Sequence, residues 1–222
     1  MAREYEIKQP IPRGAIFGPE SAIFEDFSGQ MLYGIAAGGA AYKVYKDPRA
    51  AMSGVYGLRI ENSLTQAYPG NYAGIYSFAG LWISPRLEIT HCFNPHENVY
   101  EVDIVFQFPR KHTNKLMKAR VVIRRADGNV YVYNGDFAKT LVGSFGAIEP
   151  NTWYKLTWSI NCVAEKYINV RLGDKIIDCS AVSLYYSGDA CNSGLMVFYT
   201  YNETALTATL FLDHFLVRAL PG

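Results

Sequence analysis

Alternation of apolar and polar residues is the dominant pattern along the chain, and it is clearest in the segment 99–108, VYEVDIVFQF. Side chains of a β-strand point alternately to opposite faces, so this segment predicts a strand with one apolar and one polar face. The apolar face would carry Val102, Ile104, Phe106 and Phe108, and the other face would carry Glu101, Asp103, Val105 and Gln107.

Short strand-like segments continue through most of the chain, whereas no window of about three turns keeps a helical period with end caps. Turn residues separate the segments, and Asp127-Gly128 is the strongest hairpin signal because such a turn needs positive φ. About a dozen short strands predict an all-β fold, a two-sheet antiparallel β-sandwich. Besides 99–108, the expected strands lie at 41–46, 54–61, 72–78, 86–93, 119–125, 129–134, 152–162, 166–172, 175–178, 194–201 and 208–217.

The first 20 residues differ from the rest, because they hold three of the ten prolines and no strand pattern. They predict an irregular N-terminal arm over 1–20, which either lies against a neighbouring subunit or is a loosely ordered terminus. The remainder, 21–222, has no internal repeat, linker or shift in composition. It therefore predicts a single sandwich domain.

The balance of charged residues argues against some classes of binding partner. Lys and Arg number 21 and Asp and Glu number 20, a net charge of +1, which argues against a surface built for nucleic acid or anionic membrane. No apolar run approaches the ~20 residues of a membrane-spanning helix. The 17 Tyr and 12 Phe suit half-buried strands, interfaces and sugar-contacting faces, because each ring is flat and apolar.

The N-terminal residues and the cysteines give information on the cellular compartment in which the protein is located. MAREYEIKQP shows no basic region followed by an apolar core, so no secretory signal is visible. A removed signal, or release within an assembled virus particle, would still take the protein to a cell or virion surface, which we favour over a cytoplasmic role. Cys92, Cys162, Cys179 and Cys191 have no metal-ligand spacing, and they are either free thiols or include a bridge, with Cys179 and Cys191 the nearest pair.

Four stretches share an order that is typical of one superfamily. They are FEDF at 24–27, GVYGLRIE at 54–61, the segment 153–178 and LDHFLV at 212–217. In this order they resemble the concanavalin A-like lectin/glucanase jelly roll, which includes laminin G-like modules. The resemblance implies a jelly-roll sandwich but no single chemistry, because this fold hosts lectins, hydrolases, lyases and structural modules.

Glu101 and Asp103 are the candidate catalytic residues. The EVDIVF segment that contains them resembles the E-x-D-x-(x)-E strand of laminarinase-type glycoside hydrolases. The resemblance would make Glu101 the nucleophile and Asp103 its assistant, but Val105 or Phe106 stands where the acid/base Glu is needed. Gln107 cannot donate a proton as an acid does. We therefore expect these polar residues either to be solvated on an outer strand face or to bind sugar hydroxyls.

Asp26 and Asp213 are a candidate calcium site. The first and last strands of a jelly roll are usually neighbours, so the two carboxylates could come together. Ca²⁺ takes six to eight oxygen ligands, and two carboxylates could supply part of that set. The alternative is that both acids cap turns and are solvated.

Two further groups of residues, one basic and one aromatic, are candidates to bind a ligand. The run Arg110–Arg125 holds seven of the 21 basic residues and no acid, which suits an anionic partner such as phosphate, sulfate or uronate. A solvated loop and strand face is the alternative for this run. Trp82, Tyr131 and Tyr133 are candidate sugar-stacking residues, and parity places Tyr131 and Tyr133 on one strand face.

These features predict a non-catalytic, lectin-like module that binds a glycan, with no cofactor except a structural Ca²⁺. One alternative is a structural or assembly subunit of a virus particle or surface filament, partnered by other copies of itself. The low charge, the many tyrosines and the proline-bearing arm favour that alternative. A second alternative is a laminarinase-type glycoside hydrolase with an incomplete catalytic motif. Nucleic acid is not an expected partner.

Overall fold

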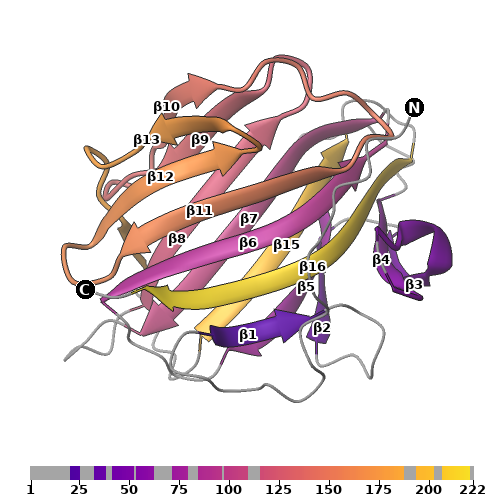
Figure 1. Cartoon of the computed structure of the whole chain (residues 1–222), viewed down its shortest axis with the longest axis horizontal. Coiled ribbons are helices and arrows are strands. Elements are labelled where there is room, and N and C mark those ends of the chain that lie inside the picture. The colour runs from indigo at the N-terminus through magenta and orange to yellow at the C-terminus, as the bar shows by residue number, and fades with distance from the viewer. Residues whose placement is uncertain are drawn as a thin grey trace.

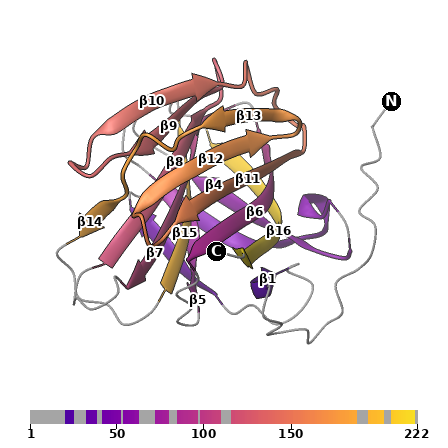
Figure 2. The same ribbon diagram turned by 60° about the vertical axis from the view of Figure 1, so that its left-hand side comes forward.

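The computed structural model describes residues 21–25, 33–38, 42–52, 54–62, 72–79, 85–96, 98–109, 116–187, 194–202 and 207–220. They form two eight-stranded antiparallel sheets that lie against each other as two layers (Figures 1 and 2). The all-β, two-sheet jelly-roll sandwich predicted by the sequence is confirmed. The predicted arm over 1–20 lies outside the described residues.

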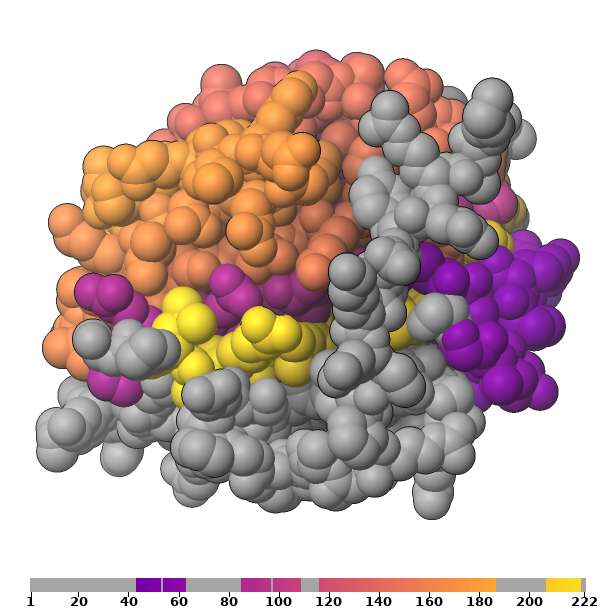
Figure 3. Space-filling model, viewed as in Figure 1, coloured from indigo at the N-terminus to yellow at the C-terminus, as the bar shows by residue number. Residues whose placement is uncertain are grey.

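One layer, here called the β6 sheet, faces the viewer in Figure 1, and Figure 3 shows its outer surface, with β16 in yellow and β11–β13 in orange. Its strand order is β13-β12-β11-β6-β16-β4-β3, and β1 pairs with β16. A 3-10 turn, η1 (Pro48–Ala50), follows β3. The strands are β1 (Ser21–Glu25), β3 (Tyr42–Asp47), β4 (Gly57–Asn62), β6 (Arg86–Pro95), β11 (Tyr154–Asn161), β12 (Lys166–Leu172), β13 (Lys175–Asp178) and β16 (Ala208–Leu220).

The other layer, called the β7 sheet, lies behind the β6 sheet in Figure 1. Its strand order is β10-β9-β8-β7-β15-β5-β2, and β14 pairs with β8. The strands are β2 (Tyr33–Gly38), β5 (Tyr72–Ala79), β7 (Val99–Pro109), β8 (Leu116–Arg124), β9 (Asn129–Tyr133), β10 (Lys139–Ser144), β14 (Tyr185–Ser187) and β15 (Gly194–Asn202).

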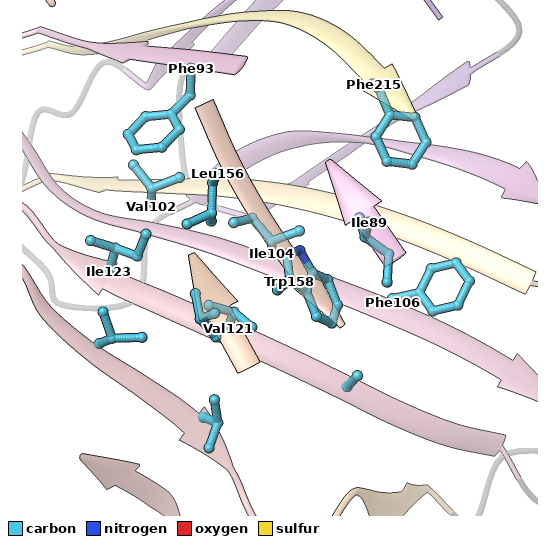
Figure 4. Packing of buried hydrophobic residues seen from close by; sticks show 14 of the residues in the cluster. Ile89, Phe93, Val102, Ile104, Phe106, Val121, Ile123, Leu156, Trp158 and Phe215 are labelled. Atoms are coloured by element: carbon cyan, nitrogen blue, oxygen red, sulfur yellow. The ribbon is translucent and has the colours of Figure 1, made fainter. Parts of the chain in front are cut away.

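The hydrophobic core fills the space between the two sheets (Figure 4). The alternating segment 99–108 contributes the apolar face that the sequence predicts, since Val102, Ile104, Phe106 and Phe108 are all buried there. Trp158 on β11 is fully buried against them from the opposite sheet. The outer face of β7 is therefore fixed as well, because a strand alternates its side chains.

The turn between β8 and β9 is the hairpin that Asp127-Gly128 predicts. Gly128 has a φ of +63°, which a residue without Cβ adopts without strain. A Cβ at this position would lie only 1.7 Å from the carbonyl oxygen of Gly146. The glycine is thus required twice, by the backbone conformation and by the close approach of the neighbouring loop.

Three cysteines, Cys92, Cys162 and Cys179, are free thiols, and burial raises the pKa of each to about 12. Cys191 lies outside the described residues. No helix that is long and apolar enough to cross a membrane occurs in the part of the chain that the structure describes.

His91 introduces an ionisable group into the inner face of β6, between Ile89 and Phe93, and its side chain is almost fully buried. Burial lowers the pKa of His91 to about 3, whereas an unfolded chain binds this proton near pH 6.5. Between these two values the unfolded state takes up a proton that the folded state excludes. We expect the free energy of unfolding to fall by about 1.4 kcal/mol for each pH unit below 6.5.

Urea unfolding of the wild type and of His91→Leu at pH 7.0, 6.25 and 5.5 measures this effect. The stability of the wild type should decline across the series, whereas that of His91→Leu should change much less. Equal slopes for the two proteins would show that another group titrates.

Candidate functional site

The outer face of strands β7 to β10, called the β7–β10 face below, collects most of the polar residues that the sequence singles out. The register pairs Glu101 with Arg124, Val122 with Tyr131, and Tyr133 with Lys139. The outward side chains are Glu101, Asp103, Val105 and Gln107 on β7, Lys118, Arg120, Val122 and Arg124 on β8, Tyr131 and Tyr133 on β9, and Lys139 and Leu141 on β10.

Asp103 is held by Arg120 from the neighbouring strand. The Arg120 Nε donates to both carboxylate oxygens, at 2.9 and 3.1 Å, and its Nη2 also binds the carboxylate. Only 1% of Asp103 is exposed, whereas 17% of the Arg120 side chain is. A guanidinium that binds a carboxylate through two nitrogens is fixed in direction as well as position. Asp103 is therefore a buried anchor and Arg120 is the group closer to solvent.

Glu101 lies next to two cations of the same face. Lys139 Nζ donates to its Oε1 at 2.6 Å, and Arg124 Nε lies 3.9 Å from the same oxygen. Arg124 also contacts Asp127, with 3.3 Å between its Nη1 and the Asp127 Oδ2. The expectation that Glu101 and Asp103 are solvated is wrong, because both are buried and ion-paired.

The position for a catalytic acid on β7 holds no carboxyl group. Val105 shares the outer face with Glu101 and Asp103 but is itself buried, and Phe106 points into the core. Retaining hydrolysis needs two carboxyl groups about 5–5.5 Å apart across the scissile bond. Asp103 cannot act as the second one, since Arg120 binds it through two nitrogens. The motif that resembles a hydrolase strand is thus incomplete in space as well as in sequence.

Tyr131 and Tyr133 lie under the cations of the face. The guanidinium carbon of Arg120 is 4.1 Å from the centre of the Tyr133 ring. Lys139 Nζ and the Arg124 guanidinium lie 4.5 and 5.1 Å from the centre of the Tyr131 ring, and Arg124 also binds the Tyr131 hydroxyl. Cations over aromatic faces are attracted by the ring quadrupole. Both predicted aromatic residues lie on the β7–β10 face, and basic groups lie over their rings.

Phe137 borders the β7–β10 face, and the sequence did not single it out. It follows β9 in the turn to β10, is 59% exposed, and has a φ of +59°. Its ring centre lies 5.3 Å from that of Tyr133 and 5.1 Å from that of Tyr185. A bulky residue with positive φ is rare, and such conformations concentrate at functional positions. The sequence carries no signal for this position of Phe137, because an isolated Phe in a turn cannot be distinguished from any other exposed residue.

Tyr167 is a second missed residue, and it reaches the site from the opposite sheet. Strand β8 changes neighbour at Arg120, since 121–123 pair with β9 and 116–118 pair with β14. The buried Tyr167 hydroxyl accepts from Arg120 N at 2.8 Å and lies 3.0 Å from the Tyr133 carbonyl oxygen, to which it donates. Burial raises the pKa of Tyr167 above its usual value, so the hydroxyl keeps its proton.

The basic run 110–125 divides between several environments. Lys118, Arg120 and Arg124 lie on the β7–β10 face, and Gln107 pairs in register with Lys118. Arg125 turns away and donates from Nε to the Val99 carbonyl at 2.8 Å. Residues 110–115 lie outside the described residues. Alternation along β8 thus places half-buried cations in a row on one surface.

Asp213, one of the two calcium candidates, lies away from this face. Asp213 is buried on β16 of the other sheet, where Oδ2 accepts from Met52 N and Oδ1 from His214 N, each at 2.8 Å. Asp26 and the stacking candidate Trp82 lie outside the described residues. Within the described ranges, no cluster of three or more His, Cys, Asp or Glu residues is arranged to hold a metal ion. Calcium stays a prediction.

Comparisons with known proteins bear on the fold. No protein-family model matches the sequence, and no curated protein matches it. Among solved structures, the cellulose induced protein Cip1 matches with a TM-score of 0.63 at 8% identity, over 89% of this chain and 97% of that one. An endo-β-1,4-glucuronan lyase from the fungus Trichoderma reesei matches with 0.61 at 10%, over 90% and 96%.

The β-glucanase of Bacillus licheniformis is a third similar structure, with a TM-score of 0.54 at 10% identity, over 92% of this chain and 99% of that one. These identities are too low to carry an activity across, but the agreement over nearly whole chains defines the architecture. The chain has the jelly-roll β-sandwich fold that the four sequence stretches imply.

Proposed function

We propose that this protein is a non-catalytic carbohydrate-binding module whose ligand lies along the β7–β10 face. The observation that carries the proposal is the arrangement of that face. Half-buried cations stand over buried carboxylates and tyrosine rings, and the exposed ring of Phe137 borders them. Polar groups held in fixed directions beside an apolar surface are the usual composition of a ligand site.

A sugar ring matches this composition. Its hydroxyl groups both donate and accept hydrogen bonds, while its axial C–H groups form an apolar surface that packs on aromatic rings. Tyrosine and carboxylate partners hold the Arg120 and Arg124 guanidinium groups in place, so little side-chain entropy is lost when a hydroxyl binds them. Phe137 supplies the exposed aromatic surface, since cations cover the rings of Tyr131 and Tyr133.

Two further observations support carbohydrate binding without catalysis. The names of the glucuronan lyase and the β-glucanase refer to polysaccharides, and both proteins have this fold. The absence of a carboxyl group at Val105 and Phe106 disfavours the hydrolase alternative. The role as an assembly subunit at a cell or virion surface stays a prediction.

A glycan array that carries neutral and acidic polysaccharides tests the proposal, followed by calorimetry on the strongest binder. We expect Phe137→Gly to weaken binding about tenfold, which is ~1.4 kcal/mol of lost packing on the sugar ring. The fold should keep its stability within about 1 kcal/mol, because relief of the positive φ offsets the lost contacts with Tyr133 and Tyr185.

Val163→Ala is the matched control for Phe137→Gly. It removes another strongly exposed apolar side chain, in the turn between β11 and β12, and should leave affinity unchanged. Failure of the wild type to bind any polysaccharide on the array would contradict the proposal. Equal affinity of the wild type and Phe137→Gly would move the site away from this end of the face.

A further inference from the structure

We infer that the ligand is a linear acidic polysaccharide, with uronate carboxylates or sulfates that face the basic row on β8. The inference rests on the proposed function and specifies the class of carbohydrate. It comes from the depth of the charged side chains on the β7–β10 face, where basic groups lie closer to solvent than their acidic partners. The sequence alone does not reveal these depths.

Two acids of the face, Glu101 and Asp103, lie beneath their basic partners. The Glu101 side chain is 12% exposed where its partner Lys139 is 31% exposed, and Asp103 is almost completely buried beneath Arg120. At Lys139 and Arg120, a ligand that approaches from solvent therefore meets an ammonium and a guanidinium group first. Four cations and two carboxylates lie on the strands of this face. Asp127 in the β8–β9 turn, with its side chain 40% exposed, adds a third carboxylate, and the exposed Asp136 in the β9–β10 turn adds a fourth.

The bases of β8 form a line. Lys118, Arg120 and Arg124 alternate with inward-facing residues, so their side chains form one row along the outer face of β8. At the rise per residue of a β-strand, the row from residue 118 to residue 124 is about 20 Å long. A linear row of cations matches an extended polymer with charges at regular intervals better than it matches a single small anion. Guanidinium groups bind carboxylate and sulfate oxygens through paired hydrogen bonds, which adds direction to the attraction.

A uronic acid unit also needs the apolar part of the site. Its ring carries an anionic group on one edge and C–H groups on its faces, so a cation and an exposed aromatic ring must be neighbours. Arg120 lies on the Tyr133 ring, and Tyr133 is in turn beside Phe137, which provides that arrangement next to the middle of the row.

Single-stranded nucleic acid is also a linear polyanion with flat rings, but the chain is less suited to it. The net charge is only +1 and the sequence pI is about 7.6, far from the basic balance of nucleic-acid-binding domains. Nucleic acid is therefore an outcome that the test must be able to detect.

The test compares polymers that differ only in charge. Polygalacturonate is titrated beside its fully methyl-esterified form, and heparin beside its desulfated, carboxyl-reduced form, with oligo-dT as a nucleic-acid probe, at 50 and 200 mM NaCl. At least one acidic polymer should bind tenfold or more tightly than its uncharged counterpart, and the difference should shrink at high salt. The two pairs distinguish recognition of carboxylate from recognition of sulfate.

Arg124→Gln should weaken binding of the acidic polymer about tenfold and binding of the uncharged polymer by less than threefold, because only the acidic polymer loses a charge pair while both lose hydrogen bonds to the guanidinium. Arg171→Gln is the matched control, because Arg171 is an exposed arginine on β12 of the other sheet and should change nothing. Equal binding of acidic and uncharged forms would overturn the inference and leave the proposed function intact. Tighter binding of oligo-dT would overturn the inference in favour of nucleic acid, and no binding to any carbohydrate would overturn both.

Discussion

Replacement of Arg120 by alanine is expected to lower the free energy of unfolding by about 3 kcal/mol and to abolish carbohydrate binding. Arg120 binds both carboxylate oxygens of Asp103, which is almost fully buried. Removal of the cation leaves that carboxylate without its compensating charge, and breaking a buried ion pair from one side is strongly destabilising. The same change removes the guanidinium that lies over Tyr133 at the centre of the site.

A paired replacement separates the two effects of Arg120→Ala. In Asp103→Leu/Arg120→Met, an apolar pair of similar size takes the place of the ion pair, and such exchanges are often neutral for stability. We expect urea unfolding to show most of the lost stability restored, while calorimetry shows no recovery of binding. Binding by the double variant would mean that Arg120 has only a structural role.

Replacement of Tyr167 by phenylalanine is expected to cost about 3 kcal/mol of stability and to weaken carbohydrate binding severalfold. The hydroxyl satisfies Arg120 N and the Tyr133 carbonyl at the point where β8 changes its neighbouring strand. Each buried backbone group left unsatisfied costs about 1–3 kcal/mol. Since Arg120 and Tyr133 both lie on the β7–β10 face, a shift of their backbone also displaces the ion pair and the ring.

Tyr154→Phe is the control for Tyr167→Phe. Tyr154 also accepts a backbone hydrogen bond, from Glu149 N at 2.8 Å, but this bond ties the hydroxyl to the loop before β11 and not to β8 or β9. We expect a loss of stability below about 1 kcal/mol and unchanged affinity, measured at a temperature where both variants are fully folded. Unchanged affinity of Tyr167→Phe under the same conditions would show that Tyr167 does not position the site.

The strands and their inward faces were largely predictable, because burial imposes a period of two on the sequence. Segment 99–108 and segment 152–162 show this, since Phe106 and Trp158 are buried as their alternation indicates. Strand β10 (Lys139–Ser144) was not predicted. It lies at the edge of its sheet with half of its residues exposed, so the core imposes no alternation on it.

The members of the site were predictable in part and their relations were not. Parity placed Glu101 and Asp103 on one face and Tyr131 and Tyr133 on another, but only the register across β7, β8 and β9 brings them together. The ion pair from Asp103 to Arg120 also depends on that register. The role of Tyr167 depends on packing of one sheet on the other, which leaves no local signature in the sequence.

The most direct test of the site is an NMR titration of the protein with the polysaccharide fragment that binds best. The side-chain Nε–Hε signals of Arg120 and Arg124, and the backbone amides of β8 and β9, should shift as the ligand binds. Signals from the outer face of the β6 sheet, such as that of Arg171, should stay in place. Shifts confined to the β6 sheet, with Arg120 and Arg124 unaffected, would contradict a carbohydrate site on the β7–β10 face.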